Sequence, residues 1–303
     1  MILSKSSQTS DPLSDVLTVL DARATRRTRF EGSGDWALAF PALERLKFVA
    51  VLQGAGWLLL PDTAPQRIET GDCCLIGRTA YAIASDPSLV PIDGTSLYAD
   101  GNDLVRLRGD DTVMLGGGIS FTPGAAAFLL DMLPAFMHVS SRSPAAAAIT
   151  AVLGLLDGES DQSAMGRMVV TARLAEVLMI HAIRTFASTS DTTGGWLGAL
   201  ADSRIGRAIQ SFHSDIARPW TVADLAAEAG MSRAAFSADF TRRVGQAPFA
   251  YMRNWRMTRA RAALAERQSS VSDVAASVGY TSQSAFGHAF RRTFGETPRQ
   301  HSA

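Results

Sequence analysis

The sequence predicts an α+β protein, with an N-terminal β-barrel and flanking helices followed by an all-α C-terminal region with a double helix-turn-helix. Three observations support this fold class. Short apolar runs separated by Gly, Pro and Asp fill the first 140 residues, helical periodicity begins near Ser143, and one helical pattern occurs twice after Thr221. Turn residues between short apolar runs are typical of strands, whereas apolar spacings of three and four are typical of helices.

The composition is that of a folded globular protein with more than one domain. Apolar residues make up 47% of the 303 residues and charged residues 19%, and the chain exceeds the size that one hydrophobic core usually organises. No apolar run reaches the ~20 residues that cross a bilayer, and the N-terminus has no apolar segment of a secretory signal. We therefore expect a cytoplasmic protein that makes no use of a membrane.

The net charge of zero conceals a basic C-terminal region. Residues 200–303 contain 14 Arg, no Lys and 8 acidic residues, a balance of +6, and the preceding residues carry the opposite balance. Because a guanidinium group can bind phosphate or guanine through two parallel hydrogen bonds, arginine suits nucleic-acid recognition. The charge division favours an anionic partner for this region.

Two segments about fifty residues apart, Val222–Pro248 and Val271–Pro298, share one pattern. Thr221 and Ser270 are each followed three positions later by Asp, which predicts a capping box at the start of a short helix. A glycine then ends this helix, and a second helix follows in which two phenylalanines, spaced i, i+4, face inward. The glycines are Gly230 and Gly279, and the phenylalanines are Phe236, Phe240, Phe286 and Phe290. A short helix, a glycine turn and a second helix form a helix-turn-helix unit.

The segment between the two copies, residues 248–267, predicts a connecting helix. Phe249, Met257, Ala260 and Leu264 fall on one face of this helix, and we expect them to point into a core. A rigid helix would hold the two units at a set separation. Because one turn of duplex is ~34 Å, two recognition helices held that far apart can enter successive major grooves.

We predict that the second helix of each copy contacts DNA. Long cationic side chains suit phosphates, and small or polar side chains suit base edges. The candidates are Ser232, Arg233, Ala234, Ser237, Arg242 and Arg243 in the first copy, Arg256 in the connecting helix, and Ser282, Gln283, Ser284, His288, Arg291 and Arg292 in the second copy. The first copy has only small residues in mid-helix, whereas Gln283 can pair with adenine and His288 can reach a purine N7. The second copy is therefore expected to discriminate sequence.

The C-terminal region resembles the DNA-binding domain of the AraC/XylS family of bacterial transcription regulators. The motifs that carry the resemblance are RIGRAIQSFHSDIARPWTVADLAAEAGMS, RMTRARAAL and VGYTSQSAFGHAFRRTFGETP, within residues 203–303. The resemblance implies that Ser232–Arg243 and Ser282–Thr293 face the major groove of double-stranded promoter or operator DNA. It also implies RNA polymerase as a partner, as for a transcription activator.

The N-terminal region is similar to the cupin-like effector and dimerisation domain found in part of the same family. ERLKFVAVLQGAGWLLL, IETGDCCLIGRTAYAI and RLAEVLMIHAIR carry this similarity. It implies an unidentified small-molecule effector and a homodimer, and divides the chain into a cupin-like domain (1–190), a linker (191–202) and a DNA-binding domain (203–303). The polar stretch from Ser188 to Gly195 is typical of a linker. A domain that only dimerises is the alternative.

The sequence predicts neither an enzyme nor a bound cofactor or metal. His138 and His181 lie too far apart to form the His-x-His pair of a metal cupin, and we expect both to be core residues. The glycines at 116–118 lack the GK[ST] ending of a phosphate-binding loop and predict a turn. Two adjacent cysteines cannot supply the four-cysteine zinc cluster and acceptor thiol of a DNA-repair methyltransferase that carries this type of DNA-binding domain.

Cys73 and Cys74 are adjacent in a predicted strand. Because neighbouring strand residues point to opposite faces, we expect one cysteine to be buried and the other to face outward. We interpret both as small apolar residues. The alternative is a thiol-based redox sensor, which requires an accessible thiolate of low pKa.

A long helix over Met168–Phe186 has apolar residues on more than one face. They are Val169, Val170, Leu174, Val177, Leu178, Ile180 and Ile183. One inward-facing stripe cannot bury all of them, so we expect this helix to form a dimer interface. The alternative is a helix buried between the barrel and the linker.

Overall fold

The computed structural model describes residues 11–122, 126–159, 164–189 and 195–302. Contacts divide the chain into two compact units. The first, which we call the barrel unit, spans Ala22–Phe121 and Leu133–Asp191. The second, the helical unit, combines Met1–Asp21, Thr122–Met132 and Thr192–Ala303. Two segments from the N-terminal half of the sequence therefore belong to the helical unit, a grouping that differs from the expected boundaries of 1–190 and 203–303.

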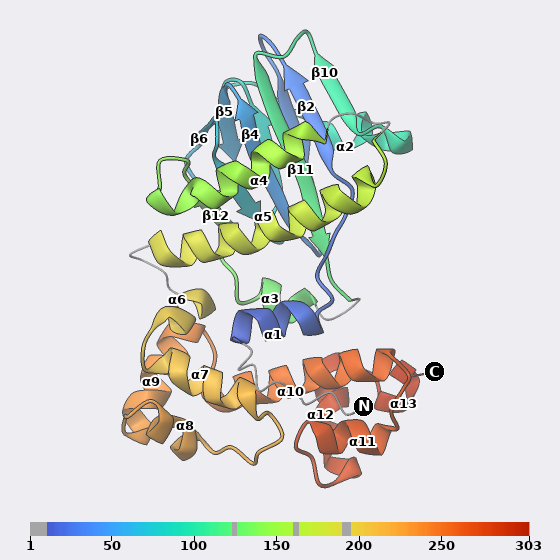
Figure 1. The fold of residues 1–303 in the computed structure, drawn as a ribbon. Helices are drawn as coiled ribbons and strands as arrows, with labels where there is room; N and C mark the ends of the chain where they lie inside the picture. The colour runs from blue at the N-terminus through green and yellow to red at the C-terminus, as the bar shows by residue number, and fades with distance from the viewer. Residues whose placement is uncertain (1–10, 123–125, 160–163, 190–194, 303) are drawn as a thin grey trace. The chain divides into compact units, whose positions relative to one another are not determined.

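Two β-sheets face each other in the barrel unit and confirm the predicted sheet-rich N-terminal domain (Figure 1). The first sheet has the order β10-β2-β11-β4-β7-β12, with β1 paired to β11, and the second has the order β6-β5-β8-β3-β9. Their strands are β1 (Arg23–Ala24), β2 (Thr28–Gly32), β3 (Ala37–Phe40), β4 (Leu46–Gln53), β5 (Ala55–Leu59), β6 (Gln66–Glu69), β7 (Cys73–Ile76), β8 (Tyr81–Ala84), β9 (Ile92–Asp93), β10 (Leu104–Leu107), β11 (Thr112–Ser120) and β12 (Phe136–Val139). A short helix, α2 (Gly94–Leu97), follows β9.

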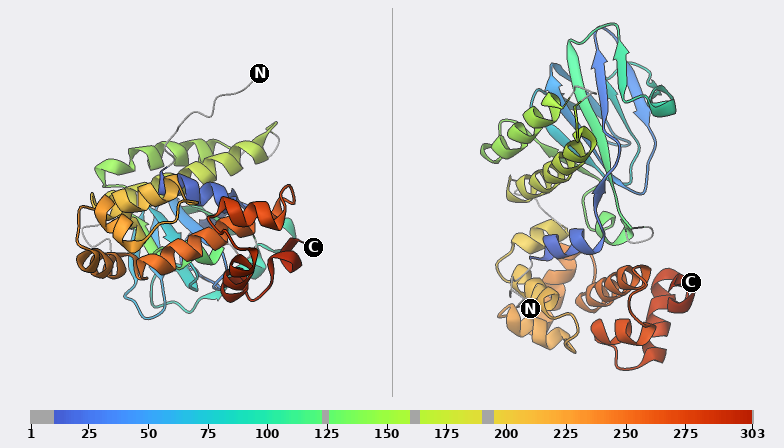
Figure 2. Two further views of the ribbon diagram at one scale, coloured as in Figure 1. Left: turned by 90° about the horizontal axis from the view of Figure 1, so that it is seen from below. Right: turned by 45° about the vertical axis from the view of Figure 1, so that its right-hand side comes forward.

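Helices α4 (Ala147–Gly158) and α5 (Arg167–Thr189) cover the outer face of the first sheet (Figures 1 and 2). Central strand β4 is consequently buried on both faces. Val49 and Val51 join the core between the sheets, and the residues that alternate with them, such as Phe48, point to the opposite face. This double burial explains why the strand reads as an almost continuous apolar run.

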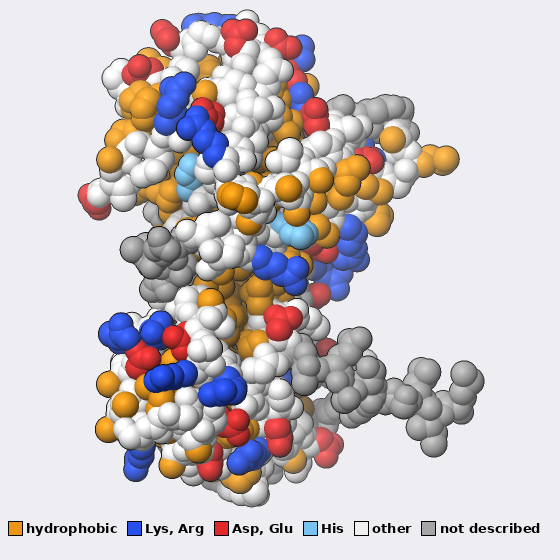
Figure 3. Space-filling model, turned by 60° about the vertical axis from the view of Figure 1, so that its left-hand side comes forward, with side chains coloured by type: hydrophobic (Ala, Val, Ile, Leu, Met, Phe, Trp, Pro, Cys, Tyr) orange, Lys and Arg blue, Asp and Glu red, His pale blue; other side chains and the backbone are white. Residues whose placement is uncertain are grey.

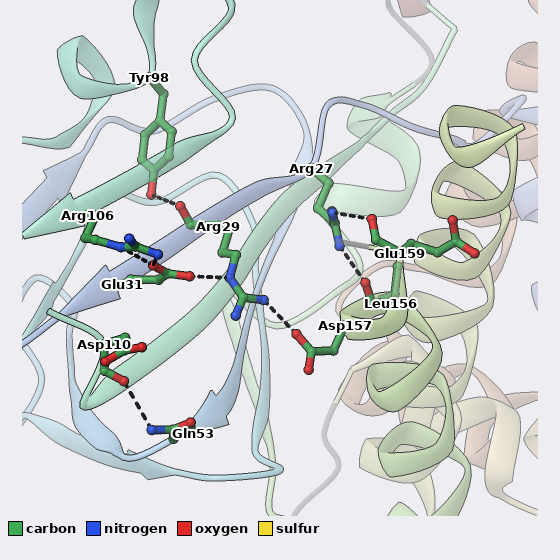
Figure 4. Close-up of polar contacts among 10 residues, drawn as sticks. All are labelled: Arg27, Arg29, Glu31, Gln53, Tyr98, Arg106, Asp110, Leu156, Asp157 and Glu159. Carbon is green, nitrogen blue, oxygen red and sulfur yellow. Dashed lines mark hydrogen bonds and ion pairs between the residues drawn. The ribbon is translucent and has the colours of Figure 1, made fainter. Parts of the chain in front are cut away.

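Ion pairs attach α4 to strand β2 (Figure 4). Arg29 contacts Asp157 of α4 at 2.6 Å and also contacts the buried Glu31 at 2.8 Å, while Arg106 binds the other oxygen of Glu31. Burial acts to raise the pKa of Glu31, but the two guanidinium groups outweigh burial and hold it below its ordinary value. Arg27 donates hydrogen bonds to carbonyl oxygens at the end of α4, where the helix dipole favours a cation.

The three glycines at 116–118 lie in the middle of β11, so the predicted turn is wrong. A Cβ at Gly117 would lie 2.5 Å from the ring of Phe48, which explains the absence of a side chain on that face. Gly116 and Gly118 point to the opposite face and line a cavity inside the barrel. Gly117 is therefore explained by close packing against Phe48, and Gly116 and Gly118 by the cavity that they line. None of the three glycines lies in a turn.

Both cysteines of β7 are fully buried, so the expectation that one faces outward is wrong. Cys74 belongs to the core between the sheets, and α5 packs against β7 on the other side. Burial raises the pKa of Cys73 to about 12 and raises that of Cys74 well above its ordinary value. Neither thiol has the exposure or the acidity that a thiol sensor requires.

The helical unit contains α1 and α3 together with the helices from α6 onward (Figures 1 and 2). They are α1 (Pro12–Val19), α3 (Ala126–Leu130), α6 (Trp196–Ala201), α7 (Ile205–Ser214), α8 (Val222–Glu228), α9 (Arg233–Val244), α10 (Pro248–Ala265), α11 (Val271–Ser277), α12 (Gln283–Phe294) and α13 (Pro298–Ser302). Helix α6 occupies half of the expected linker (191–202), and its Trp196 is fully buried. Ser188 and Thr189 belong to α5, and residues 190–194 lie outside the described part of the chain.

A buried polar chain joins α1, α6, α7 and α10. The indole N–H of Trp196 donates to the Tyr251 hydroxyl at 3.1 Å, and that hydroxyl lies 2.7 Å from Nε2 of His213. Nδ1 of the same histidine lies 2.7 Å from a carboxylate oxygen of Asp15. A neutral His213 that donates to Asp15 and accepts from Tyr251 satisfies every group in this chain.

Acid is expected to destabilise the helical unit through His213. Burial, although opposed by the Asp15 carboxylate, lowers the pKa of His213 below the ~6.5 of an unfolded chain. The unfolded state therefore binds a proton more readily, and the free energy of unfolding falls as pH decreases below ~6.5, whereas the contribution is complete above that value. Urea unfolding at pH 7.5 and 5.5, followed by tryptophan fluorescence, measures the difference.

Two variants provide the comparison. His213→Gln removes the titrating ring and should flatten the pH dependence, while His288→Gln, at an exposed position, should retain it. Equal losses of stability in wild type and His213→Gln would assign the effect to another group.

Candidate nucleic-acid interface

The two helix-turn-helix units are built by the same local rules. Reciprocal capping boxes at Thr221 and Ser270 start α8 and α11, which confirms the prediction from sequence. Gly230 and Gly279 adopt φ values of +64° and +84°, in the left-handed region that ends a helix. At Gly279 a Cβ would lie 2.6 Å from the carbonyl oxygen of Ala217, so glycine is required there on both grounds.

The second helices, α9 and α12, are anchored by their phenylalanines. Phe236 and Phe240 of α9, and Phe286 and Phe290 of α12, are at most 1% exposed, as predicted. Ser232 and Ser282 cap the two helices through their side chains, at 3.3 Å from the backbone nitrogens of Ala235 and Ala285. Anchoring on one side leaves the opposite side of each helix free to contact a ligand.

The outward face of α12 is polar and exposed. Ser284, His288 and Arg291, spaced four and three residues apart, form one stripe opposite the buried phenylalanines. Gln283 and Arg292 are also exposed. This face combines an amide, an imidazole and two guanidinium groups, which can donate to base edges and phosphates.

The equivalent face of α9 is smaller and less polar. Ala234 and Ala238 are exposed in the positions that correspond to Ser284 and His288. Thr241, which corresponds to Arg291, lies outside the set of predicted candidates, although the register of the repeat could have identified it. Its hydroxyl donates to the carbonyl of Ser237 at 2.7 Å, within its own helix.

Arginines of the two helices differ in their ion pairs. Arg242 and Arg243 both bind Asp239 of α9, and Arg243 also contacts Asp202 at 3.1 Å. Within the part of the chain that the structure describes, neither Arg291 nor Arg292 has an acidic partner. Arg291 and Arg292 of α12 are therefore available to phosphates, whereas Arg242 and Arg243 of α9 must leave or share Asp239.

Arg256 has a role inside the helical unit. Its guanidinium donates to the backbone carbonyls of Ile216 and Arg218, at 3.0 and 2.6 Å, and is half-buried. Burial lowers its pKa. These bonds attach α10 to the loop before α8, so the donors predicted to reach DNA are already engaged.

Phe249 is 63% exposed, so its predicted place on the core face of α10 is wrong. Tyr251, Met252 and Trp255 enter the core of the first helix-turn-helix unit instead. The prediction assigned one apolar stripe to the whole helix. The first half of α10 instead faces the first helix-turn-helix unit, and the second half faces the second.

The histidines of the barrel unit do not form a metal site. His138 contacts the buried Asp72 at 3.0 Å, and His181 is half-buried on α5. Among the described residues, no group of three or more His, Cys, Asp or Glu side chains lies close enough to hold a metal ion. In the same residues, no helix combines the length and apolar character required to span a membrane.

Comparisons with known proteins agree with this architecture. A family model described as Cupin matches residues 11–188, and one described as Helix-turn-helix domain matches residues 225–303. Putative AraC-like transcription regulators of Streptomyces antibioticus and Streptomyces lividans are 38% and 36% identical to this chain, and each match covers 95% of the chain and at least 96% of the relative. The solved structure of ToxT from Vibrio cholerae aligns over 93% of this chain and 96% of its own, with 13% identity and a TM-score of 0.36.

Sequence discrimination is expected to depend on Gln283. Its replacement by Ala should cost ~1–3 kcal/mol of binding free energy on a selected DNA site and relax the preference at one or two base pairs. Arg233 occupies the equivalent position in α9, and Arg233→Ala should weaken binding to all sequences by a similar factor. Selection of bound sequences from a random pool, by wild type and both variants, measures the preferences. A sharper half-site under α9 than under α12 would contradict the assignment.

Proposed function

Because the chain belongs to the family of AraC-like transcription regulators, we propose that it is a sequence-specific DNA-binding regulator whose barrel unit senses a small molecule. The observation that carries the proposal is the pair of helix-turn-helix units on one connecting helix, each with an exposed outward face. No catalytic activity is part of this proposal. Promoter DNA is the proposed partner, with RNA polymerase as the partner of the bound regulator.

One continuous helix, α10, connects the two helix-turn-helix units. Trp255 of α10 packs in the first helix-turn-helix unit, and Met257, Ala260 and Leu264 of the same helix pack in the second helix-turn-helix unit. Since both cores share one rigid helix, α9 and α12 have a defined separation within the helical unit. Two helices so held can enter successive major grooves on one side of the DNA, ~34 Å apart.

A cavity of about 420 Å³ inside the barrel supports a sensing role over a purely dimerising one. Its volume lies in the ~300–1,000 Å³ range of small-molecule sites, and its lining is mostly apolar with a few polar groups. The buried Cys73 and Cys74 do not support the redox alternative. A small molecule is therefore the proposed signal.

Binding to DNA should depend steeply on salt. If the full-length protein neutralises ~6 phosphates, log K should fall against log salt concentration with a slope of about −5. Arg292→Ala should reduce the slope by ~1, and Arg242→Ala, at the equivalent position of α9, should reduce it less because Arg242 is paired with Asp239. Fluorescence anisotropy of a labelled duplex at several salt concentrations measures the slopes of wild type and of both variants. A wild-type slope near zero would reject nucleic acid as the partner.

We also propose that the regulator is a homodimer formed through α5. Leu178 and Ile183 of this helix are buried in the barrel unit, whereas Met168, Val169 and Val170 are 80%, 66% and 41% exposed. Apolar side chains are also visible together on the surface of the barrel unit (Figure 3). Exposed apolar side chains grouped on one helix are typical of an interface between subunits.

Sedimentation of the full-length chain at tens of micromolar tests this interface. Wild type should sediment as a dimer and Val169→Asp as a monomer, because the substitution places a charge in an apolar contact. Val90→Asp is the control, since Val90 is 88% exposed elsewhere on the barrel unit. A monomeric wild type, or a dimer that Val169→Asp leaves intact, would reject the proposal.

A further inference from the structure

The cavity of the barrel unit contains three cationic side chains and no acidic one. It lies between strands β2, β3, β4, β8 and β11. Lys47, Arg45 and Arg26 contribute the positive charge, and none of the described residues that line the cavity is Asp or Glu. Arg26 pairs with Asp103, outside the lining, which leaves Lys47 and Arg45 as the cations to be explained.

Apolar and aromatic groups form the walls. The rings of Phe40 and Tyr81 stack with centroids 5.0 Å apart, and Tyr98 lies beside Phe40. Ile83 and Met114 continue the wall into the core between the sheets. These surfaces suit a flat or flexible hydrocarbon body, which would lose its contact with water inside the barrel.

Gly116 and Gly118 both line the cavity, and Gly118 lies beside the two cations. Glycine in the interior of a strand weakens the strand and marks a place where a ligand or another backbone approaches closely. Gly118 pairs directly with Lys47 across the sheet, and a Cβ at that position would lie 3.3 Å from Cδ of Arg45. A side chain at Gly118 would therefore crowd Arg45, and glycine avoids this contact.

Lys47 is an unusual residue for its position. It is 5% exposed in a strand whose only other polar residue is the terminal Gln53, and its Nζ donates to the carbonyl oxygen of Pro41 at 2.7 Å. Nζ also lies 4.5 Å from the centre of the Tyr81 ring. Among the described residues it has no acidic partner. Burial, and secondly the charge of Arg45, lower its pKa to about 8.

Arg45 is also incompletely satisfied. Its Nε is buried and has no hydrogen-bond partner within the described residues. A buried donor without an acceptor carries a desolvation penalty, and two neighbouring cations without a carboxylate repel each other. An anionic group placed between them would relieve both costs.

We infer that this cavity binds a small organic acid, whose carboxylate lies between Lys47 and Arg45 and whose apolar body lies against Phe40, Tyr81 and Met114. The inference rests on the proposed function, in which the barrel unit senses a small molecule, and specifies the chemical class of that molecule. Charge-assisted hydrogen bonds to Lys47 and Arg45 select the acid over neutral molecules of the same shape. The aromatic walls accept bodies that differ in outline, so the charge is the constant element of recognition.

Isothermal titration of the full-length protein with acids and their amides tests the inference. The probes are 1-naphthoate with 1-naphthamide, and octanoate with octanamide, because each pair has one shape and two charges. Wild type should bind at least one acid ~10–100-fold more tightly than its amide, the range expected for hydrogen bonds to a charged group. If neither acid exceeds its amide, the inference is wrong.

Three variants separate recognition by Lys47 from a structural role. Lys47→Met should abolish the preference for the acid while amide binding changes little, and Lys47→Arg should restore part of it. Arg67→Met, an exposed cation of the same unit, should have no effect. The melting temperature of Lys47→Met should be no lower than that of wild type, because the substitution removes a buried charge without an acidic partner. A preference for the acid that survives Lys47→Met, or a loss of acid and amide binding together with a lower melting temperature, would overturn the inference.

Failure of this inference and failure of the proposed function give different results. If the ligand class is wrong, the acids fail to bind while the same preparation binds duplex DNA with the expected salt dependence. If the proposed function is wrong, DNA binding is absent whether or not an acid occupies the barrel.

Discussion

Helix α10 belongs to two hydrophobic cores, and the arrangement of the helical unit depends on this dual membership. Trp255 packs beside His213 in the first core, with ring centres 5.0 Å apart, whereas Met257, Ala260 and Leu264 pack against α11 and α12 in the second. Because the helix is continuous, it couples the position of one core to that of the other. Two small domains joined by a flexible segment would lack this coupling, and their separation would vary.

Local features of the fold were predictable because they arise from residues close together in sequence. The capping boxes at Thr221 and Ser270, the left-handed glycines at 230 and 279, and the phenylalanine pairs each need only one turn of helix to be recognised. Features that depend on distant partners were not predictable. Nothing near residues 116–118 indicates that Phe48 will cover one glycine, and nothing near Cys73 indicates that a helix about a hundred residues later will pack behind its strand.

The candidate interface shows the same division. The exposed positions of α12 follow from the period of the helix and from the buried phenylalanines, so Gln283, His288 and Arg291 could be placed by spacing alone. The ion pair between Arg242 and Asp239 joins residues three positions apart on one helix, so it could also have been predicted from the sequence. In contrast, the acceptors of Arg256 are carbonyls about forty residues away, and a count of arginines cannot distinguish such an internal contact from a phosphate contact.

The position of α1 has a consequence for folding during synthesis. Asp15 and its partner His213 are 198 positions apart, and Arg259, which also contacts Asp15, is still more distant. Because domains fold in order as the chain leaves the ribosome, the barrel can form long before the partners of α1 have been made. Closure of such a long loop has a large entropic cost, although this cost grows only slowly with length. Helix α1 is thus synthesised long before it is buried, and its contacts with His213 and Arg259 form only after α7 and α10 have been made.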